Sequence, residues 1–187
     1  NQEEFALPCD GDGPLAALVF KTTADPFVGK LSYVRVYSGT FTSDTQVWNA
    51  GKEEAERVGQ AFVVRGKSQE SVDGLAAGDI GAVAKLSSAL TGDTLTQRDR
   101  PLVLPRLDFP AHVYQMAVLP KSKADLDKMT SALARIGEED PSLRVMREPD
   151  TLQILLGGLG ETHVEVAVEK IKRKFGVEIQ LETPRVP

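Results

Sequence analysis

The sequence has little of what secreted, membrane-spanning or zinc-binding proteins need. Cys9 is its only cysteine, so no internal disulfide can form, and its two histidines, His112 and His163, lie far apart. No apolar run approaches the roughly 20 residues of a membrane span, and the N-terminus lacks the basic and then apolar pattern of a signal peptide. These absences exclude a disulfide scaffold and predict a soluble, cytoplasmic protein without a metal site.

The sequence also lacks an excess of positive charge. Lys and Arg number 22 against 27 Asp and Glu, which gives a net charge of −5. Nonspecific binding to nucleic acids depends on many cationic contacts with phosphates. The composition therefore argues against a general polyanion-binding protein, and any contact with RNA must come from a local patch.

Loops that bind phosphates are missing as well. The nearest approach to GxxxxGK[ST] ends in Gly66-Lys67-Ser68, but Ala61 stands where the first glycine is needed. The Gly158-Leu159-Gly160 run places Glu161 where a pyrophosphate would rest. We therefore expect no catalytic, cofactor-binding or metal-binding residues, so this chain by itself is predicted not to be an enzyme.

The first half of the chain carries short β-strand signals separated by glycine turns, with no helix of convincing length. The candidate strands are residues 15–22, 30–38, 45–48, 59–65, 80–86 and 94–95. Such a pattern favours a small closed β-barrel, which also removes exposed sheet edges. A proline-rich stretch, 97–110, follows as a linker, and we place the domain boundary at Pro105, so that residues 1–105 form the barrel with an N-terminal tether.

Residues 30–38 show the clearest strand pattern. Leu31, Tyr33, Arg35 and Tyr37 alternate with Ser32, Val34, Val36 and Ser38, which predicts a half-buried strand. Gly39 and the Ser43-Asp44 pair then interrupt the chain before residues 45–48. We expect these two strands to form a hairpin-like pair within an antiparallel sheet.

The second half, residues 106–187, alternates strands with helices. The predicted strands are residues 113–119, 143–147, 152–156 and 177–181. A first helix is expected to begin at a Ser122 and Asp125 capping arrangement and to end at Gly137, and a second covers residues 161–175. The order β-α-β-β-α-β predicts a ferredoxin-like α+β domain.

Three blocks, in this order, resemble elongation factor G, the ribosomal translocase. DPFVGKLSYVRVYSG at 25–39 is similar to the opening strands of its second domain, and GDIGA at 78–82 with TGDTL at 91–95 is similar to segments that close that domain. LPKSKAD at 119–125, EDPS at 139–142 and GLGETH at 158–163 are similar to its third domain. The resemblance covers the chain from about Pro14 to its end, and it implies a fragment with a translation-factor-type barrel and a ferredoxin-like domain.

The resemblance implies a role in coupling GTP hydrolysis to the translocation of tRNA and mRNA. This part would supply ribosome docking and interdomain signal transmission, while GTP and Mg²⁺ would bind the GTPase domain of the full-length protein. Asn1 and Pro187 are accordingly expected to lie inside a longer chain. We expect the linker from Pro101 to Pro110 to act as a pivot between the domains.

Two groups of candidate site residues follow. Lys30, Tyr33, Arg35 and Tyr37 interleave cations with aromatic rings; the residues alone favour a solvated barrel face, and the resemblance implies contact with small-subunit ribosomal RNA and ribosomal protein. The resemblance also implies that a second group faces the GTPase domain: Asp25, Pro26, Phe27, Gly160, Glu161 and His163. The last three lie where fusidic acid binds in the family, although Thr162 and Val164 replace the usual leucines.

Two alternatives remain open. Ribosomal-protection proteins for tetracycline and the GTPase that recycles release factors have related domains, so a relative of the translocase fits the same pattern. A different class would be a free-standing regulatory module, in which the ferredoxin-like half binds a small metabolite and the barrel dimerises. Neither reading includes DNA or a membrane as a partner.

Overall fold

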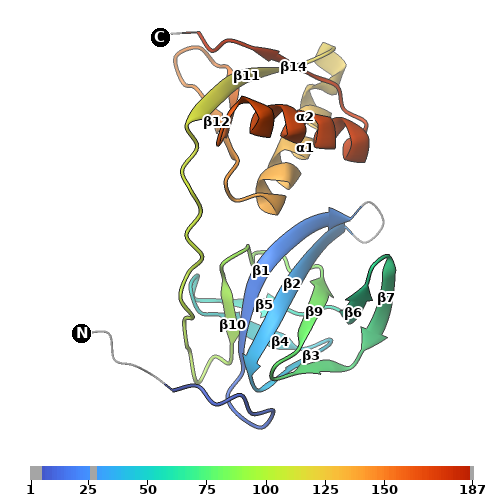
Figure 1. The fold of residues 1–187 in the computed structure, drawn as a ribbon, viewed down its shortest axis with the longest axis vertical. Helices are drawn as coiled ribbons and strands as arrows, with labels where there is room; N and C mark the ends of the chain where they lie inside the picture. Colours follow the sequence, from blue (N-terminus) through green and yellow to red (C-terminus); the bar gives the residue numbers. More distant parts are fainter. Residues whose placement is uncertain (1–5, 26–28, 186–187) are drawn as a thin grey trace, which may run out of the picture. The chain divides into compact units, whose positions relative to one another are not determined.

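The structure is a computed structural model of the 187-residue chain, and it describes residues 6–25 and 29–185 (Figure 1). The chain divides into two compact units, Asn1–Leu107 and Asp108–Pro187. This division falls just after Pro105, the boundary that the prolines suggested. Pro26 and Phe27, two of the predicted interdomain residues, lie outside the described residues.

The first unit is a barrel of short antiparallel strands, which confirms the predicted all-β class. Its main sheet has the order β5-β4-β10-β1-β2-β9-β6-β7, and β3 pairs with β8 in a separate two-stranded sheet. The strands are β1 (Ala16–Asp25), β2 (Gly29–Ser38), β3 (Thr40–Thr42), β4 (Gln46–Asn49), β5 (Glu54–Arg57), β6 (Ala61–Arg65), β7 (Ser68–Val72), β8 (Gly74–Ala76), β9 (Ile80–Ala84) and β10 (Thr94–Thr96).

Strand alternation decides which side chains form the core of the barrel. On β2, Ser32, Val34, Val36 and Ser38 are fully buried. The two valines pack in the main core with Val19, Phe41 and Leu95, among others. Because burying a valine or leucine side chain contributes about 1.5–3 kcal/mol, this face holds the sheet together. On the opposite face of β2, Leu31 is buried in a second small cluster, Tyr33 and Tyr37 are half-buried, and Arg35 is exposed.

The predicted pairing of residues 30–38 with residues 45–48 is wrong. β2 pairs with β1 on one side and with β9 on the other, whereas β4 pairs with β10 and β5. Gly39 turns the chain at φ +74°, where an added Cβ would lie 2.7 Å from Leu15 Cα. The chain leaves the main sheet at this turn and enters β3. Turn residues in a sequence therefore show where a strand ends, but not which strand lies beside it.

A buried carboxylate holds the loop between β9 and β10. Glu56 on β5 is 0% exposed, and its oxygens accept hydrogen bonds of 2.5 to 2.9 Å from the N–H groups of Ser87, Ser88 and Ala89 and from both serine hydroxyls. Burial by itself raises the pKa of this carboxyl group. The hydrogen bonds from Ser88 and Ser87 outweigh burial and lower the pKa of Glu56 to about 2. The ionised carboxylate thus joins the edge strand β5 to the 87–89 loop.

The second unit has the order β-α-β-β-α-β, which confirms the ferredoxin-like prediction. Its four-stranded antiparallel sheet has the order β12-β13-β11-β14. The elements are β11 (Tyr114–Pro120), the 3-10 turn η1 (Lys123–Asp125), α1 (Leu126–Glu139), β12 (Arg144–Arg147), β13 (Ile154–Gly158), α2 (Glu161–Phe175) and β14 (Ile179–Glu182).

Both helices pack on the same core of this unit. Val118 and Leu156 of the sheet share one buried cluster with Met129, Leu133 and Ile136 of α1 and with Val164, Ala167 and Ile171 of α2. These helical residues recur at intervals of three and four, the spacing of one helix face. Gly176 follows α2 at φ +67°, the left-handed conformation that favours glycine after a helix.

Two predicted details of α1 are wrong. The Ser122 hydroxyl donates to the Asp125 carboxylate at 2.7 Å, and neither side chain caps a backbone N–H group, so η1 precedes the helix. At its other end, α1 passes through Gly137 and ends at Glu139. A glycine inside a helix costs only about 1 kcal/mol relative to alanine, and the glutamates that follow favour helix.

Candidate functional site

The outward side of β2 carries three of the four residues that were predicted to contact RNA. Arg35 is exposed, and Tyr33 and Tyr37 are half-buried. The Arg35 guanidinium carbon lies 5.1 Å from the centre of the Tyr37 ring, a cation–π contact. Lys30 begins the same strand, but alternation places it on the other side, with Ser32 and Val34. The structure therefore brings Tyr33, Arg35 and Tyr37 together, and it separates Lys30 from them.

A β-bulge in β1 adds two residues that the sequence pattern did not indicate. The register between β1 and β2 shifts at Phe20, because Val19 pairs with Val34 and Lys21 with Tyr33. The Phe20 and Tyr33 ring centres lie 6.3 Å apart, and Lys21 Nζ lies 5.7 Å from the centre of the Tyr33 ring. Nothing in residues 15–22 shows where a bulge falls. We name Phe20, Lys21, Tyr33, Arg35 and Tyr37 the β2 face.

The β2 face combines groups that suit a nucleic-acid backbone and its bases. Lys21 and Arg35 are both exposed, so their charges can pair with phosphates. Aromatic rings next to such cations can stack on unpaired bases. A small apolar cluster of Leu31, Ala82 and Ala84 packs beside Tyr33 and supports its ring. The arrangement can therefore bind a polyanion locally, although the chain as a whole is negative.

Asp25 is the one described member of the interdomain group predicted in the first unit. It ends β1, and its backbone pairs with Gly29, the first residue of β2. Gly29 has φ +84°, a conformation that favours glycine.

The interdomain group in the second unit lies in the turn from Gly157 to His163, which we call the 157–163 turn. His163 Nδ1 accepts the backbone N–H of Leu159 at 3.0 Å, and His163 Nε2 lies 2.9 Å from Asp140 Oδ2. Since Nδ1 is an acceptor, the ring proton sits on Nε2 and is donated to Asp140. His163 therefore joins the start of α2 to the residue that follows α1, and it fixes the turn between them.

Asp140 is held as a carboxylate by its neighbours. Burial by itself raises its pKa, but the Ser142 hydroxyl and the His163 ring donate to it, and these hydrogen bonds lower the pKa below its ordinary value. The Ser142 N–H group also donates, at 3.0 Å. An ionised Asp140 favours the His163 orientation that accepts the Leu159 N–H, so this carboxylate acts on the turn through His163.

The three glycines of the 157–163 turn differ in whether the structure leaves space for a side chain. An added Cβ at Gly157 would lie 2.7 Å from His112 Cδ2, and one at Gly158 would lie 3.0 Å from Val164 Cγ2. Close packing therefore explains these two glycines. Gly160 has φ 175°, and an added Cβ there would meet no atom within 4 Å. Contacts within the described residues give no reason for a glycine at this position.

Glu161 is exposed at the first position of α2. A negative charge there is favourable because the helix N-terminus carries partial positive charge. In the part of the chain that the structure describes, no group of three or more His, Cys, Asp or Glu side chains could hold a metal ion. Likewise, none of the described helices is long and apolar enough to cross a membrane.

Comparison with known sequences and structures gives matching results for both units. The sequence model described as "Elongation factor G domain 2" matches residues 14–98, and the one described as "Elongation Factor G, domain III" matches residues 109–183. A crystal structure of a protein from Thermus thermophilus is similar to this chain, with a TM-score of 0.80 and 33% sequence identity. The similarity covers 95% of this chain and 27% of that protein, so the chain spans about a quarter of its relative's length.

The two matched segments follow one another in the order of the family's domains, and each coincides with one structural unit. The barrel and the ferredoxin-like fold agree with that assignment. The chain therefore belongs to the elongation factor G family and corresponds to its second and third domains.

Proposed function

We propose that this chain is the part of an elongation factor G that docks on the ribosome and transmits signals between domains. In this proposal the full-length protein works in the cytoplasm, binds GTP and Mg²⁺ in a separate GTPase domain, and drives the movement of tRNA and mRNA. The observation that carries the docking role is the β2 face, where Lys21 and Arg35 lie against Tyr33 and Tyr37. Its partner would be small-subunit ribosomal RNA, with ribosomal protein beside it.

The 157–163 turn would face the GTPase domain. Leu159 is 41% exposed and Glu161 is exposed, so both are available to a partner. Gly160 lies between them as the N-cap residue of α2, and an added Cβ there would meet no atom of the described residues within 4 Å. A residue without a side chain allows another backbone to approach closely, which supports a contact at this position. Asp25, Pro26 and Phe27 belong to the same proposal.

The pivot between the units would be shorter than the proline-rich stretch. The Leu104 N–H group donates to Thr94 Oγ1 at 3.1 Å, which attaches the start of the linker to the barrel. The Val113 N–H group donates to the Gly158 carbonyl at 3.0 Å, which attaches its end to the second unit. Residues 105–111 between these hydrogen bonds are all exposed. We place the pivot in residues 105–111.

Sedimentation of the chain with small ribosomal subunits at several salt concentrations tests the docking role. Each phosphate contact that is lost reduces the slope of log affinity against log salt by roughly 0.7 to 0.9, so Lys21→Ala with Arg35→Ala should reduce it by about 1.5. Lys67→Ala, which removes an exposed cation outside the β2 face, is the matched control. Equal binding by the double variant and the control would contradict docking through the β2 face.

A further inference from the structure

The barrel contains a hollow whose lining residues have no part in the proposed docking role. Its volume is about 530 Å³, and its wall includes Asp44, Arg57, Gln60, Phe62 and Lys85. Arg57 ends β5, Phe62 lies in β6 and Lys85 follows β9, so three strands meet there. None of these residues belongs to the β2 face. Binding sites for small ligands have volumes of roughly 300 to 1,000 Å³, so the hollow is large enough to hold one.

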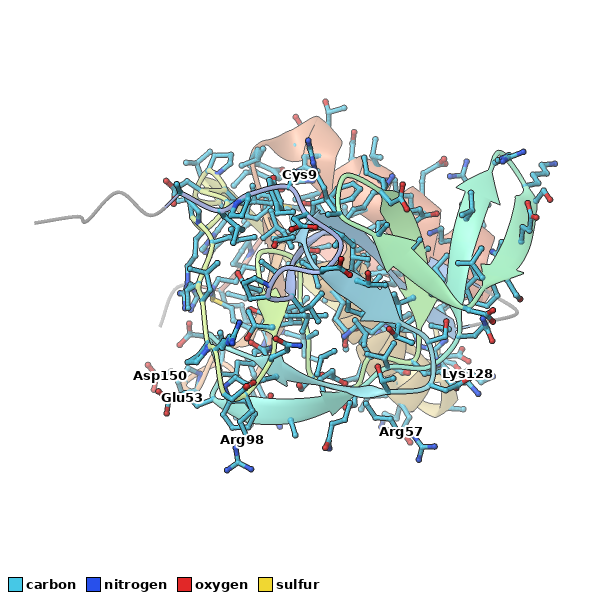
Figure 2. All side chains as sticks on the ribbon, turned by 90° about the horizontal axis from the view of Figure 1, so that it is seen from below. Cys9, Glu53, Arg57, Arg98, Lys128 and Asp150 are labelled. Carbon is cyan, nitrogen blue, oxygen red and sulfur yellow. The ribbon has the colours of Figure 1, made fainter. Side chains whose placement is uncertain are left out.

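Two cations border the hollow without a salt bridge to any of the described residues. Arg57 and Lys85 are both exposed, and within residues 6–25 and 29–185 neither forms a salt bridge. Figure 2 shows the Arg57 side chain extending away from the ribbon. A guanidinium and an ammonium group on one wall can together bind a phosphate group. The one carboxylate of the wall, Asp44, disfavours a ligand that carries several phosphates.

The remaining wall offers a ring and an amide. Phe62 is half-buried and packs beside Ala84, which fixes its position in the sheet. The Gln60 side-chain amide donates to the Val72 carbonyl at 2.9 Å and to the Ala61 carbonyl at 3.2 Å. Its orientation is therefore set, with the amide nitrogen used within the barrel. A planar ligand could stack on Phe62, and its amino group could donate to Asp44.

The backbone around the hollow is held in unusual conformations. Asp44 and Lys85 have φ of +55° and +62°, two of the four described residues other than glycine with positive φ. An added Cβ at Gly59 would lie 2.9 Å from the Ala84 carbonyl oxygen, so the two walls approach closely. Backbone strain of this kind is concentrated at binding sites. Asp44, Lys85 and Gly59 thus have backbone constraints of their own at the wall of the hollow.

We propose that this hollow binds one nucleotide unit. The phosphate pairs with Arg57 and Lys85, the base stacks on Phe62, and Asp44 accepts a hydrogen bond from an amino group of the base. The unit could be a free mononucleotide or an unpaired nucleotide of an RNA strand, since both present the same phosphate and ring. No residue of the β2 face lines the hollow, although Phe62 and Tyr33 pack against the same cluster of Leu31, Ala82 and Ala84.

Titration of the chain with each of the four nucleoside monophosphates, followed by NMR, tests the proposal. We expect saturable shifts centred on Arg57, Phe62 and Lys85, and a second titration with a single-stranded RNA hexamer identifies the source of the unit. Both titrations use the Lys21→Ala with Arg35→Ala variant, so that the β2 face contributes little to binding. Tighter binding of the hexamer by about tenfold or more would then support an RNA nucleotide, and equal binding would support a free one. If inorganic phosphate competed for the hollow as strongly as a mononucleotide does, the proposed stacking of the base on Phe62 would be wrong.

Variants distinguish specific binding in the hollow from nonspecific attraction of a phosphate to exposed positive charges. Arg57→Gln with Lys85→Asn removes both cations, and asparagine tolerates the positive φ of residue 85. This variant should weaken binding about tenfold, as should Phe62→Leu, because one stacked base is worth about 1–3 kcal/mol. Lys67→Gln changes an exposed charge outside the hollow and should bind normally. The absence of saturable binding, or unchanged binding by a folded double variant, would overturn the proposal.

Discussion

At the scale of single residues, Glu56 is a buried polar side chain whose five hydrogen bonds hold the 87–89 loop of the barrel. Its pKa of about 2, against an ordinary 4.5, corresponds to about 3 kcal/mol of preference for the ionised form in the folded state. We expect Glu56→Gln to lower the free energy of unfolding of the first unit by about 3 kcal/mol, because one amide oxygen cannot replace both carboxylate oxygens. Trp48 is the only tryptophan, so its fluorescence in urea reports this unit.

Glu54→Gln is the matched control, since Glu54 is exposed on the same strand. A surface change of this kind should stay within about 0.5 kcal/mol. Equal urea midpoints for the two variants would show that the hydrogen bonds of the 87–89 loop add nothing to stability.

The lowered pKa of Glu56 predicts how the stability of the first unit depends on pH. A carboxyl group whose pKa is lowered by folding contributes its full stabilisation above the ordinary value of 4.5. That contribution is lost as the pH falls from about 5 towards about 2. The urea midpoint of the first unit should therefore decrease over this range, and it should decrease less in Glu56→Gln. A parallel decrease in both proteins would assign the acid sensitivity to other carboxylates.

His163 has a local role that hydrogen exchange can measure. In His163→Ala the Leu159 N–H group loses its acceptor, so its amide exchange should become about tenfold faster or more. Glu161→Gln leaves that hydrogen bond in place and is the control. If Leu159 exchanged at the same rate in both variants, the histidine would not fix the 157–163 turn.

At the scale of elements, the distance between β13 and α2 is set by a glycine. An added Cβ at Gly158 would lie 3.0 Å from Val164 Cγ2, so Gly158→Ala should destabilise the second unit by about 1–2 kcal/mol. Gly160→Ala meets open space at an extended φ, but Gly160 is the N-cap residue of α2, where alanine is disfavoured, so the substitution should destabilise the unit by less than about 1 kcal/mol. Thermal unfolding followed by the helical circular dichroism signal compares them. Equal melting temperatures would refute the packing argument.

Elements with a periodic apolar pattern could be predicted from the sequence, and others could not. The bounds of α2 could be predicted from an apolar stripe of Val164, Val168, Ile171 and Phe175 that follows a glycine turn. In the structure Val164, Ala167 and Ile171 are the fully buried residues of this helix. The strands β5 and β7 were missed because they are sheet edges with mostly polar, exposed side chains. No apolar alternation can mark a strand that buries so little.

The residues of the β2 face likewise divide into those that the sequence could predict and those that it could not. Alternation along β2 predicted that Tyr33, Arg35 and Tyr37 share one side, because that rule needs only the strand itself. Phe20 and Lys21 joined them through a register shift between two strands. Such a shift depends on how distant segments pair, which local residue order does not specify.

At the scale of the whole molecule, each unit contains its own core. The buried residues of the barrel cluster and of the ferredoxin-like cluster come from different units. We therefore expect chains of residues 1–107 and 108–187 to fold separately, with circular dichroism spectra that add up to the spectrum of the intact chain. A segment that remained unfolded without the other would show that the units depend on each other.

The contrast between Glu56 and the β2 face has a consequence for reversibility. Exposed charges such as Lys21 and Arg35 are screened by dissolved ions, whereas a carboxylate that is 0% exposed is screened much less. Ionic conditions that release a bound polyanion should therefore leave the barrel wall intact. If the β2 face is the docking surface proposed above, added salt should release the bound partner while the first unit stays folded.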